Sequence, residues 1–198
     1  MLHPNLGDIW ITTRSGTRLH VFDPKPDQTD INSVAHSLAN VVRWGGHCDP
    51  FYSVGEHSIE VGVLVERYWP GWGIYGVIHD GSESAGIGDM SSPVKKGFPM
   101  IRPFEKAFID ALRERYDIED PPPHIRGLCK EADNLRMLVE ARDLMPKGVY
   151  EAIAQEMPAD LVARSVKEPK CVPGRDVKQR FLELFWHYLA SHRAMIDA

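Results

Sequence analysis

The sequence predicts an all-α fold with a small β-hairpin at its N-terminal end. Apolar residues recur at helical spacing in most long segments of the 198-residue chain. One early segment is rich in β-branched and aromatic residues on both sides of a glycine-containing turn, which is typical of a hairpin. No repeat, long linker or low-complexity tract divides the chain, so we expect a single domain over residues 1–198.

The elements are expected in a simple order. Residues 9–13 and 18–22 form the hairpin, and Asp30 is a good N-cap for a helix over 31–44. Apolar faces predict further helices over residues 54–68, 73–84, 101–115, 125–145, 149–155 and 176–194. The Gly-, Pro- and Ser-rich stretch 86–99 is expected to be a loop. The domain then comprises a hairpin and loop (1–29), a helical core (30–145) and C-terminal helices (146–198).

Composition narrows the class of protein. The formal net charge of −5 argues against a dedicated binder of duplex nucleic acid, which would present a basic face. The three cysteines are widely spaced and form no CxxC pair, which indicates reduced thiols and a cytoplasmic location. The first residues lack the pattern of a signal peptide, and charged residues interrupt the most apolar stretch, 59–78. We therefore expect no membrane partner.

One dipeptide carries the clearest chemical signal. His79 and Asp80 lie in an apolar helical run, where both would be costly to bury without partners. Local hydrogen bonding is the alternative explanation for so common a dipeptide. However, Glu83 shares their helix face, and His57 and Asp133 lie on two other predicted helices. Together they offer two imidazoles and two carboxylates, a donor set that suits a divalent ion such as Zn, Co, Mn or Mg.

Four blocks extend this pattern over residues 31 to about 145. They are SVAHSLANVVRWGGH, FYSVGEHSIEVG, VIHDGSESAGIGDMSSPVKK and KEADNLRMLVEARDLM. With them the chain resembles the HD-domain phosphohydrolases, in particular the 5′-deoxynucleotidase-like branch, and within it looks most like the bacteriophage-type dATP triphosphohydrolases. The resemblance implies an all-α HD-domain bundle with a divalent metal at its centre.

Roles follow from the resemblance position by position. It implies that the metal ligands are His57, His79, Asp80 and Asp133. Of the catalytic residues Asp80 and Glu83, Glu83 would position or activate the attacking water. The implied substrate contacts are Arg43, Lys95 and Lys130 with phosphate, Trp44 with the sugar, Asp89 with the 3′-hydroxyl and Pro93 in the nucleoside pocket.

Some of these positions have plainer interpretations. Trp44 is by default a core aromatic residue, and Lys95 with Lys96 is by default part of a solvated turn. In ESAGIGD, one more residue separates Glu83 from Asp89 than in the family, which predicts a rearranged helix end.

The resulting hypothesis is a metal-dependent hydrolase that converts dATP to deoxyadenosine and triphosphate. The alternatives are a 5′-deoxynucleotidase that acts on dNMPs through the same residues, and a non-catalytic HD module that binds nucleotides. The expected partner is a small-molecule deoxynucleotide. We also expect a homo-oligomer, and the stripe Phe181, Leu184, Phe185 and Tyr188 would be either core or an oligomer contact.

Overall fold

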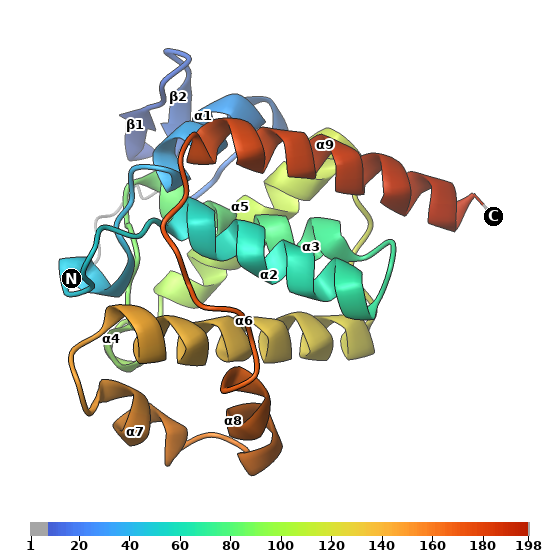
Figure 1. Ribbon diagram of the computed structural model, residues 1–198. Coiled ribbons are helices and arrows are strands. Elements are labelled where there is room, and N and C mark those ends of the chain that lie inside the picture. Colours follow the sequence, from blue (N-terminus) through green and yellow to red (C-terminus); the bar gives the residue numbers. More distant parts are fainter. Residues whose placement is uncertain (1–7, 198) are drawn as a thin grey trace.

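The computed structural model describes residues 8–197 and is an all-α fold with a small antiparallel hairpin at its N-terminal end (Figure 1). Strand β1 (Trp10–Thr12) pairs with β2 (Arg18–His20) so that Ile11 lies opposite Leu19. The predicted fold class is therefore confirmed. No helix among residues 8–197 is long and apolar enough to cross a membrane.

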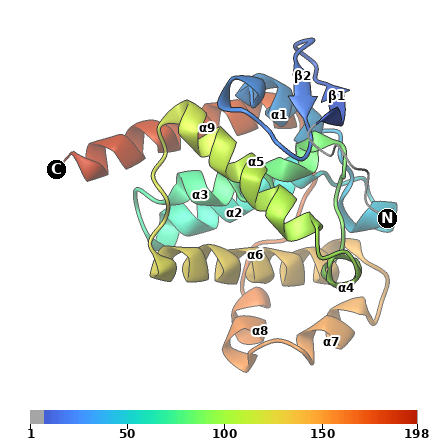
Figure 2. The ribbon, with the colours of Figure 1, turned by 180° about the vertical axis from the view of Figure 1, so that it is seen from behind.

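Helix α2 (Val54–Tyr68) lies at the centre of the fold and packs against α3 (Gly73–Ile78), α6 (Pro123–Leu144) and α9 (Val177–Ile196) (Figures 1 and 2). A capping box starts α2: the amide of Glu56 donates to the Ser53 hydroxyl, and the amide of Ser53 donates to the Glu56 carboxylate. His57 follows in the first turn and is completely buried. The capping box therefore sets where this histidine enters the core.

The backbones of α2 and α3 touch at two glycines. A Cβ atom on Gly76 would lie 2.7 Å from the Cα of Gly62, and a Cβ on Gly62 would meet the side chain of Val77. Interiors this tightly packed have no room for an added methyl group. The glycine pair therefore sets the separation of the two helices.

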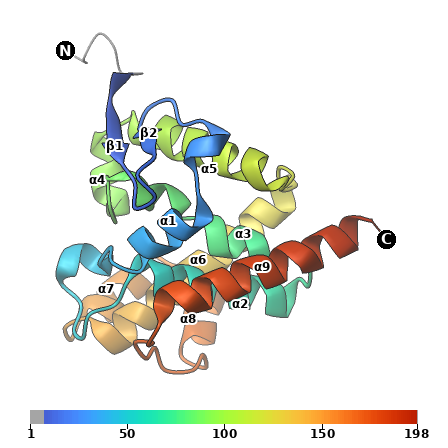
Figure 3. The same ribbon diagram turned by 90° about the horizontal axis from the view of Figure 1, so that it is seen from above.

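The remaining helices surround this centre. Helix α9 crosses over α1 (Ile31–Leu38), α2 and α3 (Figure 3), whereas α7 (Val149–Ala154) and α8 (Ala159–Ser165) pack against α6 on the other side (Figure 1). Helix α5 (Ile101–Tyr116) completes the core with α1, α3 and α9. Phe181, Phe185 and Tyr188 are buried there, so the apolar stripe of α9 is core.

Two predicted helices end early, each at a side chain that binds a helix carbonyl. Helix α1 ends at Leu38, where the Asn40 amide group donates to the carbonyl of His36 (2.7 Å). Helix α3 ends at Ile78, where the His79 ring donates to the carbonyl of Gly76 (2.7 Å). In both cases a side chain takes an acceptor that the next helical turn would use.

Short 3₁₀ turns replace the lost helix. They are η3 (Arg43–Gly46) and η4 (Gly81–Ala85), so His79 and Asp80 lie in a turn and not inside a helix. Two further differences are short helices: the stretch 86–99 contains α4 (Ser92–Gly97), and α8 was not predicted.

Candidate metal centre

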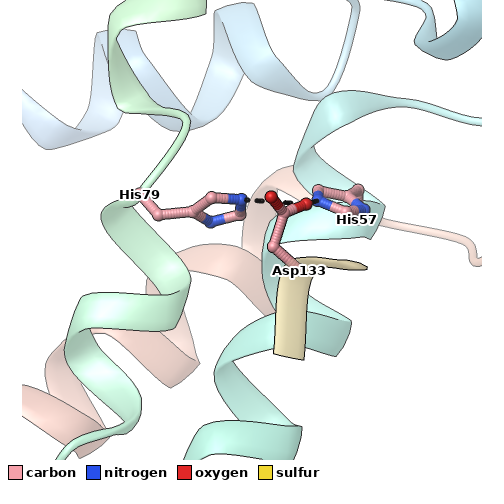
Figure 4. A group of neighbouring side chains, drawn as sticks. All are labelled: His57, His79 and Asp133. Carbon is pink, nitrogen blue, oxygen red and sulfur yellow. Dashed lines mark hydrogen bonds and ion pairs between the residues drawn. The ribbon is translucent and has the colours of Figure 1, made fainter. Parts of the chain in front are cut away.

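Three side chains from separate elements meet beside the buried end of α2. His57 comes from the first turn of α2, His79 from the turn after α3 and Asp133 from the middle of α6 (Figure 4). The Asp133 Oδ1 atom lies 3.1 Å from His57 Nε2 and 3.9 Å from His79 Nε2. The three candidate ligand atoms lie within 4.8 Å of one another, so this group could hold a metal ion.

Asp80 extends the group. Its Oδ2 atom lies 3.1 Å from Nε2 of His79 and 3.7 Å from Nε2 of His57. Burial acts to raise the pKa of Asp80, but the two imidazoles outweigh it and lower that pKa below its usual range. A carboxylate that stays ionised here is suited to a cation.

Both imidazoles turn the same nitrogen toward the group. Nδ1 of His57 donates to Glu140 Oε1 at 2.5 Å, and Nδ1 of His79 donates to the Gly76 carbonyl. Each ring therefore directs Nε2 toward the carboxylates, which is the orientation in which a metal-binding histidine offers that atom to the ion. Nε2 of His57 itself is hydrogen-bonded to Asp133 Oδ1 at 3.1 Å. Nε2 of His79 is buried and has no hydrogen-bond partner among the described residues. An unsatisfied acceptor at this place fits a metal ion.

Glu140 is a central residue that the sequence analysis missed. It is fully buried; its Oε2 accepts from Nε (3.3 Å) and Nη2 (3.2 Å) of Arg43 and from Nε1 of Trp44 (3.1 Å). Burial alone would raise its pKa, but Arg43 and His57 lower it to about 2. A usable signal existed: Glu140 lies two helical turns after Asp133, inside the apolar run LVEA.

Asp89 also reaches this network. Its Oδ1 accepts from Arg43 Nη1 (3.0 Å) and its Oδ2 from the backbone amide of Trp44 (2.6 Å). These bonds hold Trp44 at φ 58, a conformation that is uncommon for a residue with a side chain. Between Glu83 and Asp89, η4 ends at Gly86, which adopts φ 92, a left-handed conformation that favours glycine.

Glu83 lies in a separate buried position. It is only 4% exposed, and its Oε2 has no hydrogen-bond partner within residues 8–197. Burial, and next the charges of Asp80 and Asp89, raise the pKa of Glu83 to about 9. Its Oε1 lies 3.4 Å from Nζ of Lys95, which also binds Glu105 Oε1 at 2.6 Å. Lys95 is therefore shared between two carboxylates and is not a free surface cation.

The other two predicted substrate residues, Lys130 and Pro93, differ in how close they lie to the cluster. Lys130 lies one helical turn before Asp133, and its Nζ is 2.6 Å from Asp133 Oδ2. Pro93 is exposed at the beginning of α4 and lines neither of the two large cavities described next. Lys130 therefore lies at the cluster, whereas Pro93 does not line a pocket that could hold a nucleoside.

Two large cavities are lined by residues of the candidate site. A cavity of about 700 Å³ opens between α5 and α6 and is lined by His79, Lys130 and Asp133. Another, of about 780 Å³, lies between the hairpin, α1 and η4 and is lined by Glu83. A small molecule can therefore reach the candidate ligands directly from the side of α5 and α6.

Comparison with known proteins places the chain beside two uncharacterized bacterial proteins. No family model matches it. It is 34% identical over 159 residues to the uncharacterized protein RCAP_rcc00048 of Rhodobacter capsulatus, which covers 75% of this chain and 78% of the relative. It is 30% identical over 151 residues to the uncharacterized protein YfdR of Escherichia coli, which covers 76% of this chain and 81% of the relative. The chain therefore belongs to the family of bacterial proteins that includes RCAP_rcc00048 and YfdR.

Proposed function

We propose that this protein is an HD-type, metal-dependent phosphohydrolase that converts dATP to deoxyadenosine and triphosphate. The observation that carries the proposal is the convergence of His57, His79, Asp80 and Asp133. Glu83 is buried close enough for the charge of Asp80 to raise its pKa, and its Oε2 has no hydrogen-bond partner among the described residues. Mixed imidazole and carboxylate donors suit a divalent ion such as Zn, Co, Mn or Mg. The H…HD…D spacing and its flanking blocks support the same family assignment.

The residues around the ion site would each serve phosphoryl transfer. A bound divalent ion would supply positive charge for phosphate oxygens and make water more acidic. Glu83 would orient that water through Oε2. Where a bound cation offsets the charge of Asp80, which helps to raise the pKa of Glu83, this carboxyl would also take a proton that the water releases. Lys95, bound to Glu83, would place positive charge where negative charge develops on phosphate. These are positioning and electrostatic roles, which are the main needs of this reaction class.

The deoxyribose preference would come from the segment that holds Trp44. Its ring is fixed by the hydrogen bond to Glu140, and its backbone by Asp89. A fixed ring against C2′ would exclude a 2′-hydroxyl by steric clash. Arg43 and Asp89 are already paired, so in this proposal they hold Trp44 in place and would meet the nucleotide only by exchanging that pairing.

The direct experiment is to incubate the metal-loaded protein with each dNTP and each dNMP and to identify the phosphate product. We expect triphosphate from dATP. Release of phosphate from dNMPs alone would instead indicate a 5′-deoxynucleotidase. Tight nucleotide binding without any product would indicate a non-catalytic module and would overturn the proposed function.

A variant tests the ligand set independently. Asp80→Ala should lose the metal and all activity while circular dichroism shows that the helices persist. The matched control is Asp160→Ala, which removes an exposed carboxylate from α8. This control should keep both its metal and its activity. Full metal occupancy in Asp80→Ala would contradict the assignment.

A further inference from the structure

We propose that the groove between α5 and α6 binds the two outer phosphates of the substrate and so selects a nucleoside triphosphate over a monophosphate. This inference rests on the proposed function of the metal centre. It assigns a role to Arg126, at the far end of the groove from the metal cluster, and to Arg113 on the facing helix.

The groove begins at the cluster. Its cavity of about 700 Å³ is lined by two of the candidate metal ligands, His79 and Asp133, and by one face of each helix. Five basic residues lie along it: Arg102, Lys106, Arg113, Arg126 and Lys130. A phosphate bound at the cluster would therefore lie at one end of a groove that is lined by basic side chains.

The charge of the groove is opposite to that of the whole chain. Four acidic residues also line it, but Asp133 belongs to the metal cluster and Glu105 binds Lys95. Because Asp133 pairs with Lys130, Asp110 and Asp120 remain to balance Arg102, Lys106, Arg113 and Arg126. The protein has a formal net charge of −5, so this local excess of positive charge marks a site for an anion.

The spacing along α6 matches an extended anion. Lys130 and Arg126 precede Asp133 on one helix face, at three and seven residues. With a rise of 1.5 Å per residue, they lie about 4.5 and 10 Å along the axis from Asp133. A single phosphate at the cluster would meet Lys130 alone. A chain of three phosphates would pass Lys130 and come within reach of the long side chain of Arg126.

Arg126 belongs to a preformed pair of guanidinium groups. Its Nη1 lies 2.6 Å from Asp120 Oδ2, and Arg113 Nη1 lies 2.7 Å from Asp120 Oδ1. One carboxylate therefore holds two arginines, and the Arg126 side chain remains 50% exposed. The free donors of a guanidinium fit phosphate oxygens in pairs, which a lysine cannot reproduce.

The test compares Arg126→Ala with a closely matched control. Arg67 is 49% exposed and also binds one carboxylate, that of Glu168, but it lies on α2 outside the groove. Calorimetry on the metal-loaded proteins would measure the affinities for inorganic triphosphate and inorganic phosphate. Arg126→Ala should weaken triphosphate binding about 10- to 100-fold, as the loss of a charge-assisted contact does, and leave phosphate binding unchanged. Arg67→Ala should change neither affinity.

Kinetics then separate this proposal from the proposed function. The kcat/KM for dATP should fall by the same factor in Arg126→Ala, and Arg126→Lys should restore part of it. If the wild-type protein hydrolyses no nucleotide, the proposed function fails, and triphosphate binding still tests the groove. If wild-type hydrolysis is normal and triphosphate affinity is the same in Arg126→Ala and Arg67→Ala, the groove proposal is overturned and the proposed function stands.

Discussion

The two sides of the metal cluster are built in opposite ways. On the closed side, Glu140 and Arg43 are buried, and the pair binds His57, Trp44 and Asp89. On the open side, between α5 and α6, the ion pairs share partners, and all of these partners except the mostly buried Arg113 are about half exposed. Buried pairs are costly to break, whereas exposed pairs contribute little to stability and exchange partners readily. The closed side therefore orients the ligands, and the open side is free to accept a substrate.

The largest effect is expected from breaking the closed side. Glu140→Ala removes the acceptor of His57 and leaves the buried guanidinium of Arg43 with Asp89 alone. We expect a loss of about 3–5 kcal/mol in the free energy of unfolding and a fall of about 10- to 100-fold in metal affinity. Urea denaturation and metal titration measure the two effects.

Glu131→Ala is the control for that prediction, because it removes a part-exposed glutamate from the same helix. Its partner is Arg164 in a surface ion pair, which is worth at most about 1 kcal/mol. Equal losses in both variants would mean that the closed side has no special role.

The next effect concerns the buried carboxyl of Glu83. Glu83→Gln keeps the shape of a buried side chain but removes its ability to take a proton. We expect kcat to fall about 10²–10⁴-fold, with metal content and nucleotide affinity retained. Glu114→Gln, on the exposed side of α5, should leave kcat unchanged. A near-normal kcat in Glu83→Gln would remove this residue from catalysis.

Trp44→Ala tests whether a residue of the closed side also selects the sugar of the substrate. The variant loses the ring and its hydrogen bond from Nε1 to Glu140, but keeps the backbone amide that donates to Asp89. We expect the ratio of kcat/KM for dATP over ATP to fall by about tenfold or more, because a steric barrier to the 2′-hydroxyl is removed. If Trp44 only packs the core, both substrates slow equally and the ratio stays constant.

The smallest effect is expected on the open side. Lys106 is 76% exposed and pairs with Asp110, one helical turn away on α5. Lys106→Ala should change the free energy of unfolding by no more than about 0.5 kcal/mol, as is usual for such helix pairs. A loss above about 1 kcal/mol in urea denaturation would show that this side also holds the fold together.

Local signals predicted part of this structure, and long-range contacts decided the rest. The expected bounds of α2, 54–68, agree at both ends because a capping box starts the helix and Trp69-Pro70-Gly71 follows it. The early ends of α1 and α3 depend on side chains that bind helix carbonyls, which apolar spacing does not reveal.

The same division holds for the site. Polar residues inside apolar runs identified His79 and Asp133, and the structure brings both to the cluster. Glu140 stood in a similar run, but its importance comes from Arg43, which is 97 residues away in the sequence. Pairing over such a distance becomes visible only when the helices are packed.

The glycine contact between α2 and α3 gives the metal centre a hidden requirement. Gly76 lies against Gly62, and its carbonyl also orients the ring of His79, whose centroid is 5.2 Å from that of His57. A methyl group at either glycine would push the helices apart and widen the span that an ion must bridge. A relative that keeps every ligand but replaces either glycine would therefore lose the metal through a residue that is not itself a ligand.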